Sequence, residues 1–134
     1  MLHLRRSYPS ACLVGMDLGF FAHCLTGANV SPEWVLDHQI YKDVRDVVQE
    51  DLEGFDAVIH LAAVSNDPMG KEFEIVTDEI NYQSSIKIAN LAKSAKVKNY
   101  VFASSCSVYG EASEFPKKED DDLNPLTAYA KSKI

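Results

Sequence analysis

The feature that most constrains this chain is a run of three segments in its middle. Residues 56–63 (DAVIHLAA) are a short apolar run that leads into polar residues at 65–68, which predicts a buried strand. Residues 73–95 repeat apolar or small side chains at spacings of three and four, the period of an amphipathic helix. A second apolar run follows at 99–103 (NYVFA). Strand, helix and strand in this order predict a parallel pair with a right-handed crossover.

The region before this unit extends the alternation. Residues 11–16 (ACLVGM) are typical of another buried strand, and Ile40-Tyr41 of a weaker one. A helix start or turn is expected at residues 31–34, and a short helix at residues 43–52. The chain contains no internal repeat and no low-complexity linker, so we expect one α/β domain over residues 1–134.

Charge and composition exclude several classes of protein. The formal net charge of −7 argues against a nucleic-acid partner, because phosphate binding needs clustered Lys and Arg. Acidic residues are concentrated between Glu111 and Asp122, where two lysines precede the run at 119–122, and this is typical of a solvated loop rather than a metal site. No apolar run approaches the roughly 18 residues of a membrane span, and the basic start MLHLRR lacks the apolar stretch of a secretion signal. Three cysteines without CxxC spacing fit a reducing, cytosolic setting.

The chemistry is concentrated near the C-terminal end of the sequence. Ser105 follows the apolar strand at 99–103, and Tyr129 and Lys133 lie four residues apart. Residues four apart share one face of a helix, and a nearby ammonium favours the phenolate form of a tyrosine. A serine hydroxyl beside them could bind the same substrate oxygen. These three residue types are the parts of a proton-transfer site for alcohol and carbonyl chemistry.

The order of these motifs resembles the extended short-chain dehydrogenase/reductase family, in its NAD-dependent sugar-nucleotide epimerase/dehydratase branch. The matching features are HLAA at the end of the 56–63 strand, Asn81 in the long helix, VFASSCSVYG and PLTAYAKSK. YxxxK alone is common by chance, but after a strand that ends in SSxSVYG it is specific. The resemblance implies a doubly wound parallel sheet of Rossmann type, NAD as cofactor, a nucleotide-sugar substrate and a homodimer.

The resemblance also implies a role for each matching residue. Tyr129 would be the catalytic base and acid, Lys133 would assist it and hold the nicotinamide ribose, and Ser105 would bind the reacting sugar hydroxyl. The residues expected to bind or surround the cofactor are Asp17, Asp43, Val44, Leu61, Ala62, Ala63 and Asn81, together with Tyr129 and Lys133.

Several of these positions have an equally physical alternative. Asp17, which follows a strand, would hydrogen-bond the adenosine ribose, or it is a plain turn aspartate. Asp43 would contact adenine or cap a helix, and both roles can hold together. Asn81 is a polar residue in an apolar helix and needs a partner in any case. His60 lies mid-strand, where a core histidine with a satisfied hydrogen bond is expected rather than a catalytic one.

One departure from the family pattern narrows the chemistry. Family members that act as 4,6-dehydratases carry an acid pair directly after the position of Ser105. Here those positions hold Cys106 and Ser107, which cannot protonate a leaving hydroxyl and remove a carbon-bound proton as an acid pair does. The sequence is more similar to an epimerase or a simple oxidoreductase.

A glycine-rich turn of the form GxxGxxG, expected near the start of the family, is not found. Residues 15–22 give GxxxGxxA, which is one residue too long. The better match makes residues 11–16 the second strand of the family sheet and Met1–Ser10 the tail of its first helix. We therefore expect an internal piece of a larger enzyme, without the first strand and the C-terminal substrate-binding region, in which the site is unformed.

Three functions remain open at this point. The first is an NAD-dependent epimerase or oxidoreductase that acts on a nucleotide-activated sugar. The second is a non-catalytic scaffold that binds a partner through an exposed apolar strand and does not bind NAD. The third is a reductase of a non-sugar carbonyl compound, which would use the same three site residues.

Overall fold

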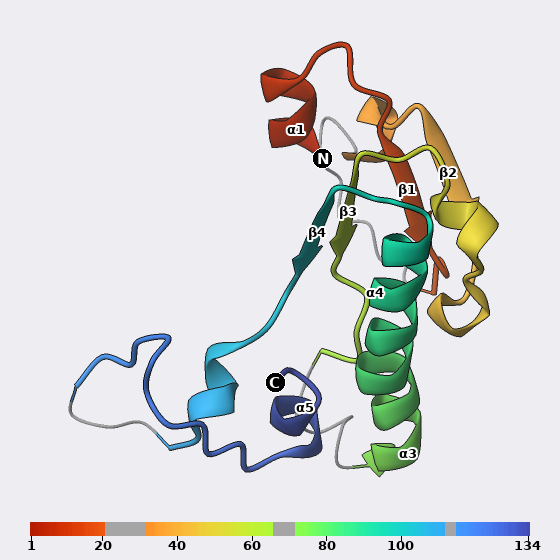
Figure 1. Cartoon of the computed structure of the whole chain (residues 1–134). Helices are drawn as coiled ribbons and strands as arrows, with labels where there is room; N and C mark the ends of the chain where they lie inside the picture. The colour runs from red at the N-terminus through yellow and green to blue at the C-terminus, as the bar shows by residue number, and fades with distance from the viewer. Residues whose placement is uncertain (21–31, 66–71, 112–114) are drawn as a thin grey trace. The chain divides into compact units, whose positions relative to one another are not determined.

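The computed structural model of the chain describes residues 1–20, 32–65, 72–111 and 115–134 (Figure 1). The contacts divide it into two compact units, Met1–Asp46 and Val47–Ile134, and each is described by itself. Four features discussed above lie wholly or partly outside the described residues: the part of the GxxxGxxA segment beyond residue 20, Cys24, Ser31 at the start of the 31–34 turn, and the end of the 65–68 loop.

The first unit is built around a parallel strand pair. Helix α1 (Leu2–Ser7) precedes β1 (Val14–Asp17), and the 3-10 helix η2 (Pro32–Val35) precedes β2 (His38–Tyr41). The two strands pair in parallel with Val14 beside His38 and Asp17 beside Tyr41. Both predicted strands are confirmed, although β1 begins three residues later than the apolar run at 11–16 and includes the aspartate that follows it.

The short helix predicted over residues 43–52 is wrong. The structure has two separate 3-10 helices there, η3 (Val44–Asp46) and η4 (Gln49–Leu52). Val47 and Val48 separate them, and the backbone of Val48 is extended. Val47 is 1% exposed, so the burial of this side chain in the second unit competes with the continuation of a helix.

The second unit contains the predicted strand–helix–strand arrangement. Strands β3 (Ala57–His60) and β4 (Asn99–Phe102) pair in parallel, with Ala57 beside Asn99 and His60 beside Phe102. Between them a long helical run begins with α3 (Glu74–Thr77), continues through the π-helix η5 (Asp78–Gln83) and ends with α4 (Ser84–Ser94). Figure 1 shows this run as one continuous helix beside the two strands. The long helix is thus confirmed, with a π-helical turn that its period did not predict.

Side chains alternate across the β3–β4 pair. Val58, His60, Tyr100 and Phe102 are buried or half-buried, whereas Ile59 and Val101 are exposed. The covered face lies toward α4, because the hydroxyl of Tyr100 donates to the carbonyl oxygen of Ser85 at the start of that helix. The apolar core of this unit is completed by Leu52, Ile88 and Ala92.

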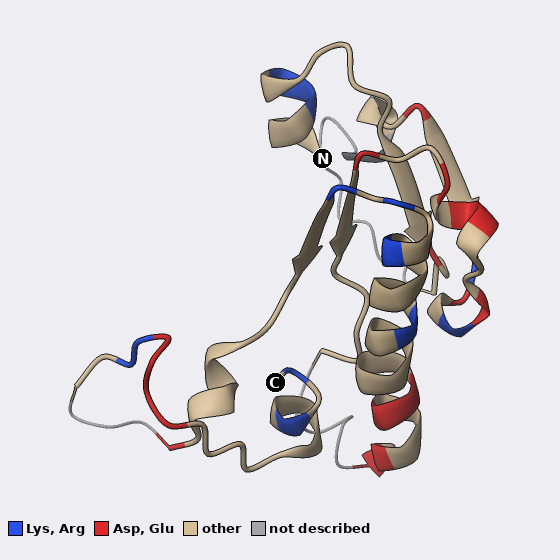
Figure 2. Ribbon diagram, in the orientation of Figure 1, with Lys and Arg blue, Asp and Glu red and all other residues tan. Residues whose placement is uncertain are grey.

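The chain then forms two short helices that carry the candidate site. The 3-10 helix η6 (Cys106–Tyr109) follows β4, and α5 (Ala128–Lys131) lies near the C-terminal end. These helices contact each other, and α5 also contacts α3 and η5. The loop between them carries the acidic residues at 119–122 (Figure 2). Most of this loop is exposed, as expected for a solvated segment.

Candidate functional site

Lys133 and Tyr129 lie together at the end of α5. The Lys133 ammonium is 5.8 Å from the centre of the Tyr129 ring and 4.9 Å from the centre of the Phe102 ring. Lys133 is only 3% exposed, and burial lowers the pKa of its ammonium. Within the described residues it has no carboxylate at ion-pair distance. The predicted pairing of these two residues therefore exists, with aromatic rings around the charge.

Two hydroxyl groups fix α5, which carries Tyr129, and the turn after it, which carries Lys133. The Thr127 hydroxyl caps the N-terminus of α5 by accepting a hydrogen bond of 3.0 Å from the Ala130 amide. At the other end, the Ser104 hydroxyl donates to the carbonyl oxygen of Lys133 over 2.6 Å. Ser104 follows β4, so this bond joins the end of the strand to the residue that carries the ammonium. Sequence reasoning missed Ser104, because a bond across 29 residues leaves no local signal.

Asn81 links α5 to the loop that follows β3. It is fully buried in η5, and its amide exchanges two hydrogen bonds with the backbone of Val64, of 2.7 and 3.0 Å. The same amide nitrogen donates to the Ser132 hydroxyl, which in turn donates to the carbonyl oxygen of Tyr129. A π-helical turn often marks a functional site, and here it holds the asparagine that connects three segments of the unit.

Ser105 is at the start of η6, the helix that contacts α5. Its hydroxyl oxygen accepts two hydrogen bonds from Ser107, one from the amide at 3.2 Å and one from the hydroxyl at 2.9 Å. A serine oxygen has two acceptor positions and one proton. Both acceptor positions are therefore used, and the Ser105 proton is left to donate to another group. Ser107 thus makes Ser105 a hydrogen-bond donor toward any further group. In the sequence, Ser107 stands out only because it replaces one residue of an acid pair.

The remaining predicted residues of the second unit lie at the end of β3. Leu61 and Ala62 are exposed, and Ala63 is half-buried next to Val64, which Asn81 holds. Small residues such as Ala62 and Ala63 after a parallel strand allow a ligand to approach the backbone closely. Asn81, Ser105, Tyr129, Lys133 and these three residues all belong to the second unit.

Asp17, Asp43 and Val44 belong to the first unit, at the ends of its two strands. The Asp17 carboxylate accepts a 2.6 Å hydrogen bond from the amide of Gly19, where φ is +77°, so the turn role of Asp17 is present. The Asp43 carboxylate accepts bonds from the amide and the guanidinium of Arg45. These bonds lower the pKa of Asp43, and they confirm its capping role at η3. The cofactor roles of these residues stay predictions.

His60 is a buried histidine with a satisfied hydrogen bond, as predicted. It is 6% exposed, and its Nε2 lies 2.9 Å from the hydroxyl of Ser85. Burial lowers the pKa of His60, and the positive charge of Lys133 lowers it further.

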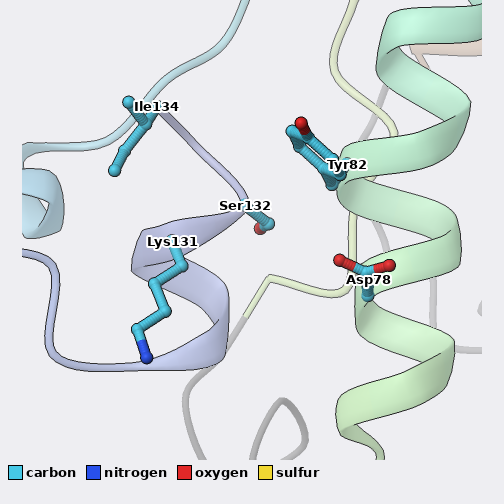
Figure 3. A pocket seen from close by; sticks show the side chains of 5 residues that line it. All are labelled: Asp78, Tyr82, Lys131, Ser132 and Ile134. Carbon is cyan, nitrogen blue, oxygen red and sulfur yellow. The ribbon is translucent and has the colours of Figure 1, made fainter.

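Two hollows lie beside α5. The larger, of about 440 Å³, is lined by residues of η5 and of the C-terminal end: Asp78, Tyr82, Lys131, Ser132 and Ile134. Figure 3 shows Asp78 and Tyr82 projecting from the helix on one side, with Ser132 on the other. The smaller, of about 180 Å³, is lined by Ser107, Gly110, Leu126, Thr127 and Ala130. The smaller hollow borders the serine that orients Ser105.

No helix in the described ranges is both long and apolar enough to cross a membrane.

Comparison with known proteins identifies the family of the chain. Residues 26–134 match the family described as the NAD dependent epimerase/dehydratase family. The UDP-glucose 4-epimerase of Corynebacterium glutamicum is 34% identical over 96 residues, which are 69% of this chain and 29% of that protein. The UDP-glucose 4-epimerase of Lactobacillus helveticus is 34% identical over 82 residues, or 61% of this chain and 25% of that protein.

Solved structures give the same result at the level of the fold. A dTDP-glucose 4,6-dehydratase from Streptomyces venezuelae, solved with NAD bound, matches with a TM-score of 0.82 and 26% identity over 98% of this chain and 42% of that chain. A UDP-N-acetylglucosamine 4-epimerase from Methanobrevibacter ruminantium matches with a TM-score of 0.72 and 25% identity over 91% of this chain and 47% of that chain.

The parallel α/β architecture is therefore the Rossmann fold of these enzymes, and the chain spans 42% of the dehydratase and 29% of the Corynebacterium epimerase. The parallel strand pairs and the family match over residues 26–134 both support this assignment. The chain belongs to the NAD-dependent epimerase/dehydratase family of enzymes.

Proposed function

We propose that this chain carries the proton-transfer site of an NAD-dependent epimerase that acts on a nucleotide-activated sugar, with Ser105, Tyr129 and Lys133 as its working residues. The observation that carries the proposal is the burial of the Lys133 ammonium against the ring of Tyr129. The ammonium lies beside the tyrosine without a carboxylate partner among the described residues. Tyr129 would take a proton from a sugar hydroxyl as general base.

The three residues divide the reaction between them. As the carbon-bound hydrogen of the sugar leaves as a hydride, Tyr129 removes the hydroxyl proton and the alcohol becomes a ketone. Ser105 donates a hydrogen bond to the same oxygen, because Ser107 occupies its acceptor positions. In an epimerase the keto-sugar turns, the hydride returns to its other face, and Tyr129 returns the proton. NAD, when bound, supplies the acceptor and donor of that hydride.

The residues fit NAD in two respects. Asp17 is exposed at the end of β1, where a carboxylate can accept hydrogen bonds from ribose hydroxyls and disfavours a 2′-phosphate. The buried ammonium of Lys133 has donors left for the nicotinamide ribose. Asp43 and Val44 would contact the adenine, and Leu61, Ala62 and Ala63 would line the cofactor beside β3, with Asn81 holding that loop.

Two observations favour an epimerase of nucleotide sugars. Cys106 and Ser107 replace the acid pair of a 4,6-dehydratase, and the Ser107 hydroxyl is engaged with Ser105. The curated relatives named above are UDP-glucose 4-epimerases, which makes a UDP-hexose the first substrate to test. A reductase of a non-sugar carbonyl compound would show NADH oxidation with simple ketones and no conversion of UDP-hexoses.

The proposal includes a homodimer. Ile75, Tyr82 and Ile86 are exposed apolar side chains along the α3–α4 helical run. Exposed apolar side chains on a long helix are suited to pack against a second copy of it.

The test measures conversion of UDP-glucose to UDP-galactose by the protein expressed from its complete natural gene. Tyr129→Phe and Lys133→Met should each lower kcat by about 100-fold or more, and Ser105→Ala by about 10-fold or more. Lys131→Met is the matched control, because Lys131 is an exposed lysine two residues before Lys133. Equal activity of Lys133→Met and Lys131→Met would contradict the proposed site. A folded protein that binds NAD but converts no UDP-hexose would contradict the proposed reaction.

A further inference from the structure

His60 occupies a central position behind the candidate site. It is the last residue of β3, and its partner in the parallel ladder is Phe102, the last residue of β4. Side chains at paired positions project from the same face of a sheet. The two rings are accordingly stacked, with their centres 6.0 Å apart and an angle of 17° between their planes. The ring of Phe102 is the one that lies 4.9 Å from the Lys133 ammonium.

The hydrogen bond of His60 has a defined direction. Ser85 donates its only hydroxyl proton to the carbonyl oxygen of Asn81, one helical turn earlier. The Ser85 oxygen can therefore only accept from His60, so the proton of this bond is on Nε2 of the imidazole. This bond ties the imidazole to the first turn of α4, and through Ser85 to the residue that holds the loop after β3.

These contacts form a closed circuit around the candidate site. From Lys133 they run through Phe102 and His60 to Ser85 and Asn81. From Asn81 they return through Ser132 to Tyr129. His60 is the point at which the aromatic part of the circuit joins the hydrogen-bonded part.

We propose that His60 is a positioning residue for Lys133: by donating from Nε2 to Ser85 it fixes the His60–Phe102 ring pair against which the Lys133 ammonium lies. This inference rests on the proposed function, because it concerns the same tyrosine–lysine pair. His60 touches neither substrate nor cofactor in this account, and it acts only through Phe102.

The charges around His60 are consistent with this role. The titratable groups that face its ring are Lys133, at the end of α5, and Tyr100, whose ring is stacked 6.4 Å away on β4. From α4, Ser85 contributes only its hydroxyl. A second positive charge on the imidazole would repel the Lys133 ammonium, so an uncharged ring is the form that can hold it in place.

Three variants separate the parts of this contact. His60→Phe keeps a ring but loses the donor, His60→Gln keeps a donor but loses the ring, and Ser85→Ala removes the acceptor while both rings remain. His38→Gln is the matched control, because His38 is an exposed strand histidine of the first unit. The readouts are the Lys133 side-chain titration by NMR and the pH profile of kcat, each measured on protein shown to be folded by its NMR spectrum.

The proposal expects the pKa of Lys133 to rise toward its ordinary value in His60→Phe, His60→Gln and Ser85→Ala, and kcat to fall by about 10-fold to 100-fold. His38→Gln should change neither. In the unmutated protein, the nitrogen spectrum of His60 should show its proton on Nε2 at neutral pH. The inference is overturned if the proton is on Nδ1, or if folded His60 and Ser85 variants leave the Lys133 titration unchanged. If Lys133→Met and Tyr129→Phe lose activity but the His60 and Ser85 variants keep it, the inference about His60 is wrong and the proposed function still holds.

Discussion

At the scale of single residues, Gly110 is the position where a side chain is least tolerated. Its φ is +80° and its ψ is −136°, a region that side chains other than glycine rarely adopt. A Cβ added there would collide with the carbonyl oxygen of Asn124. The glycine thus allows the chain after η6 to pass closely along the segment that leads to α5, beside the smaller hollow.

Gly110→Ala should lower the free energy of unfolding by about 1–3 kcal/mol, because it adds a collision to backbone strain. Gly54→Ala is the control, since Gly54 also has a φ of +80° but a Cβ there would meet nothing within 4 Å. Urea unfolding of both variants measures the difference. A Gly54→Ala loss equal to that of Gly110→Ala would show that the contact with Asn124 contributes nothing.

The sequence predicted some residue pairings and missed others for a physical reason. Tyr129 and Lys133 are neighbours because α5 and the turn that follows it bring together residues four positions apart, which is a local property. The bond from Ser104 to Lys133 and the bond from Asn81 to Ser132 join residues 29 and 51 positions apart. Such bonds depend on the packing of β4, η5 and α5, which a single sequence does not specify.

At the scale of elements, Arg5 joins α1 to the segment before β2. Its guanidinium donates to the carbonyl oxygens of Val35, Pro9 and Ala11 and forms a 2.6 Å ion pair with Asp37. Asp37 also accepts from the amide of Leu13, and these bonds lower its pKa. In the first unit, the described residues include no buried large apolar side chain. This hydrogen-bonded arginine therefore contributes much of what orders α1.

Arg5→Lys should destabilise the first unit by about 1–3 kcal/mol, because an ammonium cannot replace the planar fork of donors. Arg6→Lys is the control, since Arg6 is the exposed neighbour in the same helix. Amide hydrogen exchange in residues 2–17 and 32–41 measures the effect. Equal exchange in the two variants would contradict the role given to Arg5.

The elements themselves were predicted where the sequence pattern is strong. Strands β3 and β4 and the helix between them followed from apolar runs and a clear period. The helix predicted at 43–52 failed because Val47 is drawn into the core of the second unit and the chain there is extended. The π-helical turn was not predictable, since it serves the long-range bonds of Asn81.

At the scale of the whole molecule, the chain belongs to the NAD-dependent epimerase/dehydratase family and has its Rossmann fold. The proposed homodimer can be tested at this scale. Ile86→Glu should convert a dimer into a monomer, because it replaces an exposed apolar side chain of α4 with a charge. Lys87→Glu, at the next exposed position of α4, should leave the dimer intact. Sedimentation velocity distinguishes the two species, and a wild-type monomer at micromolar concentration would contradict the arrangement.

The most direct test of the central claim follows a deuterium label at carbon 4 of UDP-glucose. The complete natural protein with NAD should produce UDP-galactose that keeps the deuterium, because the hydride leaves carbon 4 and returns to it while Tyr129 handles only the hydroxyl proton. Mass spectrometry of the product reads the label. UDP-galactose that has lost the deuterium to solvent, or no product from folded protein saturated with NAD, would contradict the account.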